Sequence, residues 1–218
     1  MLETINAIEA RILGSLVEKQ LTTPEYYPLT LNALVNACNQ KNNREPVMSL
    51  DEATVTNALE SLRDRNLVYV YYGSTSRVPK YKHMLPSVYE LEPAEVAVVA
   101  VMLLRGPQTL GELRTRTERM HEFGGLGEVQ ETLDRLSRRD EPIVVKLPVL
   151  AGQKEARFGH LLSGDIDVEA FAAAHPTRAA QAESSNERIT KLETEVSELR
   201  SEVESLKTTF DEFKRQFE

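Results

Sequence analysis

The residues of this chain that could do chemistry are cations, amides and tyrosines gathered in its first third. Lysine and arginine side chains bind phosphate groups, and cations interleaved with aromatic residues are typical of surfaces that lie over a nucleic-acid backbone. Asparagine can pair with adenine, and threonine can hydrogen-bond a base edge. The pattern predicts a surface for double-stranded DNA. Its residues are Thr54, Asn57, Lys41, Arg44, Arg77, Lys80 and Lys82.

Enzymatic chemistry finds little support in the sequence. The four histidines are far apart, and none stands at metal-ligand spacing from another histidine or a cysteine. No phosphate-binding loop of the Gly-x-x-x-x-Gly-Lys type and no nucleophile elbow occurs. The single cysteine, Cys38, lies on an apolar helical stripe and is expected in the core. We therefore predict no catalytic residue, no metal and no cofactor.

One pattern of apolar spacing occurs twice, over residues 9–85 and 95–162. The triplet Val55, Leu59, Leu62 matches Val129, Leu133, Leu136, and His83 near the end of the first copy matches His160 in the second. This repeat predicts that the chain contains two copies of one structural unit, whatever motifs each copy carries.

Each copy predicts three helices followed by a β-hairpin, which is the order of a winged helix-turn-helix. Thr30 is a plausible N-cap of the second helix, Ser49 with Glu52 suggests a capping box for the third, and Asn66 suits a helix end. The fold class is therefore mainly α with small β-hairpins (α+β), with tandem winged helix-turn-helix domains. In the first copy the elements are residues 5–19, 31–38, 50–66, 67–72 and 78–83, and in the second 95–104, 110–119, 127–138, 143–147 and 157–161.

The C-terminal segment differs in kind. Apolar residues follow one another there in steps of three and four, with Ile and Val at the a positions and Leu at the d positions. This spacing favours a parallel two-stranded coiled coil, and thus a homodimer. The alternative is a single amphipathic helix lying on its own domains. The dimerisation residues would be Ile189, Leu192, Val196, Leu199, Val203 and Leu206.

These patterns divide the chain into four parts. Residues 1–88 form the first winged-helix domain and residues 89–164 the second. Residues 165–186 form a linker that can hold one short helix, and residues 187–218 form the coiled-coil helix.

Charge leaves two functions open. The chain is net −8, but residues 1–88 hold nine basic and nine acidic side chains, and most of the excess acid lies after residue 164. A neutral first domain permits DNA binding, whereas the acidic third helix of the second domain favours a protein partner. The first interpretation is a dimeric, regulatory DNA-binding protein, and the alternative is an assembly factor whose winged domains bind protein. A third, purely structural interpretation also remains open. In it, the hairpin cations serve only to keep an exposed hairpin soluble, and the side chains of the polar loop 39–46 form hydrogen bonds within the loop's own turns.

Two long and unusual strings carry a family resemblance. They are Pro-Glu-Tyr-Tyr-Pro-Leu-Thr at residues 24–30 and Asn-Gln-Lys-x-Asn-Arg-Glu-Pro at residues 39–46. Over roughly residues 5–164 the chain resembles the YceH-like bacterial proteins. The resemblance implies a pair of winged-helix domains, and it supplies no established substrate, partner or catalytic residue.

No apolar run approaches the ~20 residues that a membrane-spanning helix requires. The N-terminus lacks a basic region followed by an apolar segment, which a secretory signal would show. We therefore expect a cytoplasmic protein without a membrane partner.

Overall fold

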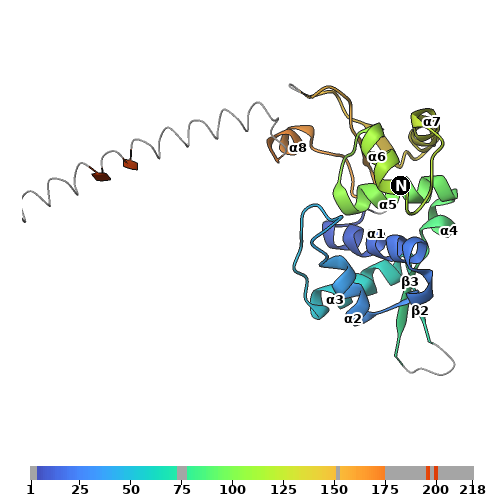
Figure 1. Ribbon diagram of the computed structural model, residues 1–218. Coiled ribbons are helices and arrows are strands. Elements are labelled where there is room, and N and C mark those ends of the chain that lie inside the picture. The colour runs from blue at the N-terminus through green and yellow to red at the C-terminus, as the bar shows by residue number, and fades with distance from the viewer. Residues whose placement is uncertain (1–3, 73–77, 151–152, 175–194, 197–198, 201–218) are drawn as a thin grey trace, which may run out of the picture. The chain divides into compact units, whose positions relative to one another are not determined.

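The computed structural model describes residues 4–72, 78–150, 153–174, 195–196 and 199–200. It shows a mixed α+β fold in which the order helix, helix, helix, strand, strand occurs twice (Figure 1). A short helix, α4 (Leu85–Tyr89), joins the two copies, and α8 (Val168–Ala174) follows the second. The first copy consists of α1 (Ala7–Thr22), α2 (Leu31–Cys38), α3 (Glu52–Asp64), β2 (Val68–Tyr71) and β3 (Lys80–His83). The second consists of α5 (Pro93–Arg105), α6 (Leu110–Thr117), α7 (Leu126–Ser137), β4 (Val144–Lys146) and β5 (Phe158–His160).

A short third strand completes the sheet of the first copy and was not expected from the sequence. Strand β1 (Leu29–Thr30) follows the 3-10 helix η1 (Pro24–Tyr26) and pairs antiparallel with β3, giving the order β1-β3-β2. In the second copy, Gln108 forms the equivalent bridge to Phe158. In the first copy α2 begins directly after this strand, and in the second copy α6 begins two residues after Gln108.

The ends of the helices follow side-chain capping. Thr30 caps α2 as predicted, since its hydroxyl accepts from the Ala33 N–H at 3.3 Å. The prediction of Ser49 as the cap of α3 is wrong, because the Asp51 carboxylate accepts from the Thr54 N–H at 2.8 Å instead. Asn66 adopts the left-handed conformation (φ 59°) expected at a helix end.

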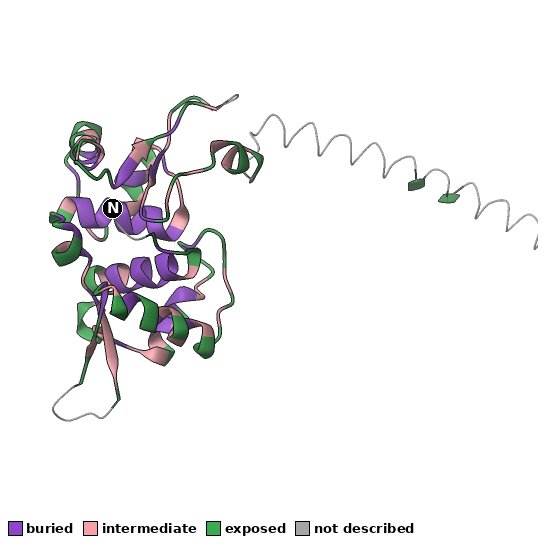
Figure 2. Cartoon of the chain, turned by 180° about the vertical axis from the view of Figure 1, so that it is seen from behind, coloured by how far each residue is buried: buried purple, intermediate pink, exposed green. Residues whose placement is uncertain are grey.

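The predicted core triplets of both copies are buried, and they lie on α3 and α7. The centre of the core is the packing of α1 on α5. Residues 9–17 of α1 and 95–104 of α5 are buried without interruption, and Figure 2 shows both helices in the buried colour. A helix that is buried on all sides must contact neighbours on all sides. Each of these helices therefore packs on its own copy with one face and on the other copy with the opposite face.

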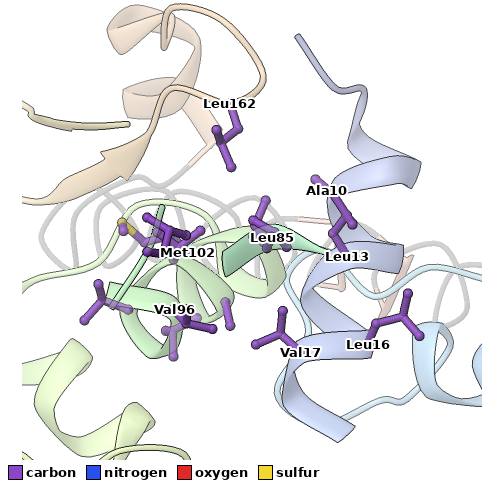
Figure 3. Packing of buried hydrophobic residues seen from close by; sticks show 14 of the residues in the cluster. Ala10, Leu13, Leu16, Val17, Leu85, Val96, Met102 and Leu162 are labelled. Atoms are coloured by element: carbon purple, nitrogen blue, oxygen red, sulfur yellow. The ribbon is translucent and has the colours of Figure 1, made fainter. Parts of the chain in front are cut away.

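Both copies contribute to one continuous cluster of apolar side chains. Figure 3 shows Leu13 and Val17 of α1 in the same cluster as Val96 and Met102 of α5. Residues 1–149 and 154–168 accordingly form one compact unit. The boundary at residue 88 between two domains stays a prediction.

Gly14 permits this close approach of helices. A Cβ atom at position 14 would lie 2.8 Å from Leu104 Cγ and 3.1 Å from Leu103 Cβ. Real Cβ contacts are not so short, so any larger residue would push α1 away from α5.

An ion pair between a buried glutamate and a partly exposed arginine recurs at equivalent places in the two copies. Glu9, near the start of α1, pairs with Arg65 after α3, and Glu95, near the start of α5, pairs with Arg139 after α7 at 3.0 Å. Arg65 also donates to the carbonyl of Thr4, and Arg139 to that of Glu90. Each arginine thus ties the end of the third helix to the start of the first helix. The repetition of this whole arrangement is independent support for a duplicated unit.

The predicted coiled coil lies almost entirely outside the described residues, as do Ile189, Leu192, Val203 and Leu206. Only Val196 and Leu199 fall within them, each in a helical segment, with exposed fractions of 46% and 54%. Residues 169–218 belong to a second unit together with residues 150–153. Of the linker, the predicted short helix is present as α8.

We predict that Gly14→Val lowers the free energy of unfolding by about 1–3 kcal/mol, because the added methyl groups overpack the α1–α5 contact. Gly111→Ala, in α6, is the matched control. Nothing lies within 4 Å of a Cβ at that position. This change should stabilise the protein by up to about 1 kcal/mol through helix propensity. Urea denaturation of both variants is the measurement, and a Gly14→Val protein as stable as the wild type would contradict the packing argument.

Candidate nucleic-acid interface

The β2–β3 hairpin presents a face of alternating lysines and tyrosines. Tyr69 pairs with Lys82 and Tyr71 with Lys80, and because side chains alternate along a strand, these four project from one side of the hairpin. Both tyrosines are exposed, and the Lys82 ammonium lies 5.9 Å from the centre of the Tyr69 ring. The residues that alternate with them lie on the other side of the hairpin, where Val70 and Tyr81 are half-buried and Val68 and His83 are buried. We call Tyr69, Tyr71, Lys80 and Lys82 the hairpin face.

The corresponding face of the second hairpin is different. Val145 pairs with Gly159 at the position that Tyr69 and Lys82 occupy in the first hairpin. A Cβ at Gly159 would lie 2.3 Å from Ile166 Cδ1, so the chain that follows β5 covers this face. The second hairpin therefore lacks the free surface of the first, and Arg157, the cation two residues before Gly159 on this face, is paired with Glu112 at 2.7 Å.

Helix α3 carries the two predicted base-reading residues. Asn57 is exposed and Thr54 is half-buried, so Asn57 is the freer of the two to meet a ligand. Glu52 and Glu60 are exposed on the same helix and would repel phosphate. Helix α3 therefore suits contact through its amide better than contact with a phosphate backbone.

Arg44 does not fit the prediction of a phosphate contact. Its side chain is fully buried, and its guanidinium forms a two-pronged ion pair with Glu18 at 2.6 and 3.1 Å. It also donates to the carbonyl of Ala37 at the end of α2. Every donor that could have reached a phosphate is used within the protein, so Arg44 is a structural residue that joins α1 to α2.

The polar loop 39–46 is held in place by its own side chains. The Asn39 amide donates to the Leu50 carbonyl and accepts from the Leu50 N–H, both at 2.8 Å, which closes the ends of the loop. The Glu45 N–H donates to the Leu104 carbonyl at 2.9 Å, which ties the loop to the second copy. These contacts favour the interpretation in which the amides satisfy the loop itself. Lys41 remains exposed at its tip.

A second arginine supports the same loop from beneath. The Arg11 guanidinium is buried and donates to the carbonyls of Cys38 and Pro46, at the two ends of the loop. Cys38 is buried, as predicted. Arginines at the last carbonyls of a helix satisfy its unpaired acceptors and interact favourably with its dipole. Arg11 and Arg44 together fix the end of α2 and hence the start of the path to α3.

The three remaining residues of the predicted DNA surface are the cations of the first hairpin. Lys80 and Lys82 are half-buried members of the hairpin face. Arg77 lies outside the described residues, so the structure gives no position for it. The sequence did not reveal that the face would be open in one copy and covered in the other.

The acidic surface of α7 is present as the sequence suggested. Glu128 and Glu131 are exposed, and the Asp134 carboxylate accepts from Gln130 and pairs with Arg138. Such a helix would repel a phosphate backbone. The third helices of the two copies thus share a core triplet and differ in surface charge.

Two histidines stand at equivalent places in the hairpin strands, His83 buried in β3 and His160 half-buried in β5. His83 pairs with Val68 and His160 with Val144 in their respective ladders. Burial lowers the pKa of each imidazole to about 4, with a small further effect of Lys82 on His83. Neither ring nitrogen of His83 has a hydrogen-bonding partner within the described part of the chain. Both histidines are therefore neutral at neutral pH.

We predict that the free energy of unfolding falls as the pH is lowered from about 6.5 to about 4. The unfolded chain binds protons at both histidines in this range, while the folded chain does not, so protonation favours the unfolded state by roughly 3 kcal/mol for each histidine. Denaturant titrations across this pH range are the measurement. His83→Leu should flatten the dependence, and an unchanged slope in that variant would contradict the assignment.

Comparison with known proteins places the chain in a family. A family model described as "Protein of unknown function, DUF480" matches residues 5–153. A UPF0502 protein of Geobacter sulfurreducens is 50% identical over 216 residues, covering 98% of each chain, and one of Pelobacter propionicus is 52% identical over 218 residues with the same coverage. A UPF0502 protein of Opitutus terrae is 50% identical over 91% of this chain and 84% of its own. The chain therefore belongs to the DUF480/UPF0502 family.

The family is uncharacterised, and the names of these relatives specify no reaction. Among the described residues, no helix combines the length and the apolar character that crossing a membrane would demand.

Proposed function

We propose that this protein is a non-enzymatic, dimeric DNA-binding protein of regulatory type, built from two winged-helix domains like those of the YceH-like proteins. The first copy would contact DNA through the hairpin face and α3. The proposal rests on one observation. The hairpin face, with its two lysines and two tyrosines, is exposed on the first hairpin, whereas the corresponding face of the second hairpin is covered.

The chemistry of the hairpin face suits a phosphate backbone. Lys80 and Lys82 would neutralise phosphates, and the flat tyrosine rings beside them would pack on sugars or in the minor groove. Arg77, between the two strands in sequence, would add a third cation. Asn57 of α3 would read a base edge, with Thr54 supporting it.

Lys41 is an exposed cation and remains among the proposed DNA contacts. Arg44 is not among them, because its guanidinium is already paired with Glu18. The second copy would serve as an interaction module, since its acidic α7 surface suits a protein better than DNA. The alternative function, an assembly factor that binds protein alone, rests on that same acidic surface.

We expect the double variant Lys80→Gln/Lys82→Gln to weaken binding to all duplexes alike. Removing two phosphate contacts should reduce the slope of log affinity against log salt concentration by about 1.8. The matched control is Lys146→Gln, which removes a lysine from the second hairpin. Fluorescence anisotropy of the full chain with mixed duplexes over a salt series is the measurement.

The control variant should keep the wild-type slope. Equal loss of slope in the control would mean that the contact is general and does not belong to the hairpin face. Absence of binding even at low salt, where attraction to the backbone is strongest, would replace the DNA-binding proposal with the assembly-factor alternative.

The proposed dimer forms through the heptads of residues 187–218, with attractive pairs such as Glu195 with Arg200 between the helices. We expect a chain that ends at residue 186 to sediment as a monomer while the full chain sediments as a dimer. Glu195→Lys with Glu202→Lys should weaken the dimer by a few tenths to about 1 kcal/mol per pair, because like charges would then face each other. An unchanged mass after truncation would contradict the coiled coil.

A further inference from the structure

A basic cleft of about 640 Å³ lies between the two copies, away from the hairpin face. One side is formed by the last turns of α1 and by the loop 39–46, and the other by the last turns of α5 and by the end of α6. No residue of α3, β2 or β3 lines it. Pockets that hold ligands of nucleotide size have volumes of this order.

The cleft carries an excess of positive charge. Five basic side chains line it against two carboxylates, Glu18 and Glu118. Glu18 pairs with the buried Arg44 at 2.6 Å and also lies 3.7 Å from the Lys19 ammonium, so it compensates Lys19 alone among the cleft cations. The five cations are Lys19, Lys41, Arg105, Arg116 and Arg119.

Three of these five cations lack an ion-pair partner among the described residues. Among the described residues, neither Lys41 nor Arg119 has an ion-pair partner, and Arg105 donates only to the neutral amide oxygen of Asn43. Arg116 pairs with Glu112 at 3.3 Å on the surface of α6. Burial, and then the neighbouring charges of Arg116 and Arg44, lower the pKa of Arg105. Positive groups held together in this way attract a polyanion.

Helix dipoles explain only part of this arrangement. The carbonyl ends of α1, α5 and α6 favour nearby cations, which accounts for Lys19, Arg105 and Arg116 in their last turns. Lys41 lies in a loop and Arg119 beyond the end of α6, so that explanation does not extend to them. The remaining charge is free for a ligand.

The walls of the cleft also have polar and apolar parts. Gln40, Asn42 and Asn43 offer amide donors and acceptors on one side. The apolar part of the wall is the half-buried Met120, with Val101 and Leu104, which are 3% and 2% exposed. A ligand that combines phosphate groups with a flat, partly apolar ring would use both parts.

We propose that this cleft binds a free nucleotide carrying two or more phosphate groups. The phosphates would meet Arg105, Arg116 and Arg119, and the base would lie against the apolar wall. The ligand would touch both copies at once. The inference does not depend on the proposed DNA binding, because the cleft and the hairpin face share no residue and Lys41 is the one cleft residue that the proposed DNA surface also includes.

Isothermal titration calorimetry of the full chain at low salt tests the proposal, with ATP, GTP, ADP, adenosine and inorganic tripolyphosphate as probes. ATP or GTP should bind more tightly than tripolyphosphate, which lacks the base, and adenosine should not bind. Arg116→Gln with Arg119→Gln should weaken nucleotide binding by about tenfold for each cation removed, the usual value of a charge-assisted hydrogen bond. Neither residue takes part in the buried network, so the variant should fold.

Two controls separate this cleft from other basic surfaces. Arg114→Gln removes an exposed cation from the same helix outside the cleft, and Lys80→Gln/Lys82→Gln alters only the hairpin face. Both should leave nucleotide binding unchanged. Lys41 is left intact because it also belongs to the proposed DNA surface. The proposal is overturned if no nucleotide binds, if tripolyphosphate binds as tightly as ATP, if a control variant loses binding equally, or if a DNA duplex displaces the nucleotide.

Discussion

The close packing of α1 on α5 is the constraint on which the rest of this molecule depends. Both helices are buried on all sides, and Gly14 brings their backbones near enough for one core to run through both copies. Because the two first helices face each other, each copy turns its remaining elements outward. The first hairpin is thereby left free at the surface, and the ends of α1 and α5 bound a cleft that neither copy could form alone.

The two copies share the interactions that hold their helices together and differ in their surfaces. The Glu9–Arg65 and Glu95–Arg139 pairs hold the first and third helices together in the same way, and the capping threonines Thr30 and Thr109 begin the second helices alike. The hairpins have diverged, since one has lysines and tyrosines where the other has Val145 and Gly159 beneath Ile166. One hairpin face is open and the other is covered, so the two copies can have different roles within one compact unit.

The sequence predicted those parts of the fold that follow from local periodicity. Val55, Leu59 and Leu62 recur at helical spacing, so their burial could be expected, as could the order of elements in each copy. The two-residue strand β1 is too short to leave a pattern. The cap of α3 was misplaced because Ser49 and Asp51 are both good caps two residues apart, and only the backbone path selects Asp51.

Long-range pairing limited what could be predicted of the site. An arginine in a polar loop has the same sequence pattern whether it faces water or a buried carboxylate. Glu18 and Arg44 are 26 positions apart, so the sequence does not indicate their pairing. The basic cleft draws its cations from both copies, so no single stretch of sequence displays it. The hairpin cations could be found because the two strands are close in sequence and alternate regularly.

Hydrogen–deuterium exchange of the full chain, with and without a DNA duplex at low salt, tests the central claim most directly. If the first copy binds DNA, amide exchange should slow in α3, β2 and β3 when the duplex is present, while exchange in α7, β4 and β5 stays as it is in the free protein. Slower exchange confined to the second copy, or no change anywhere, would contradict the claim.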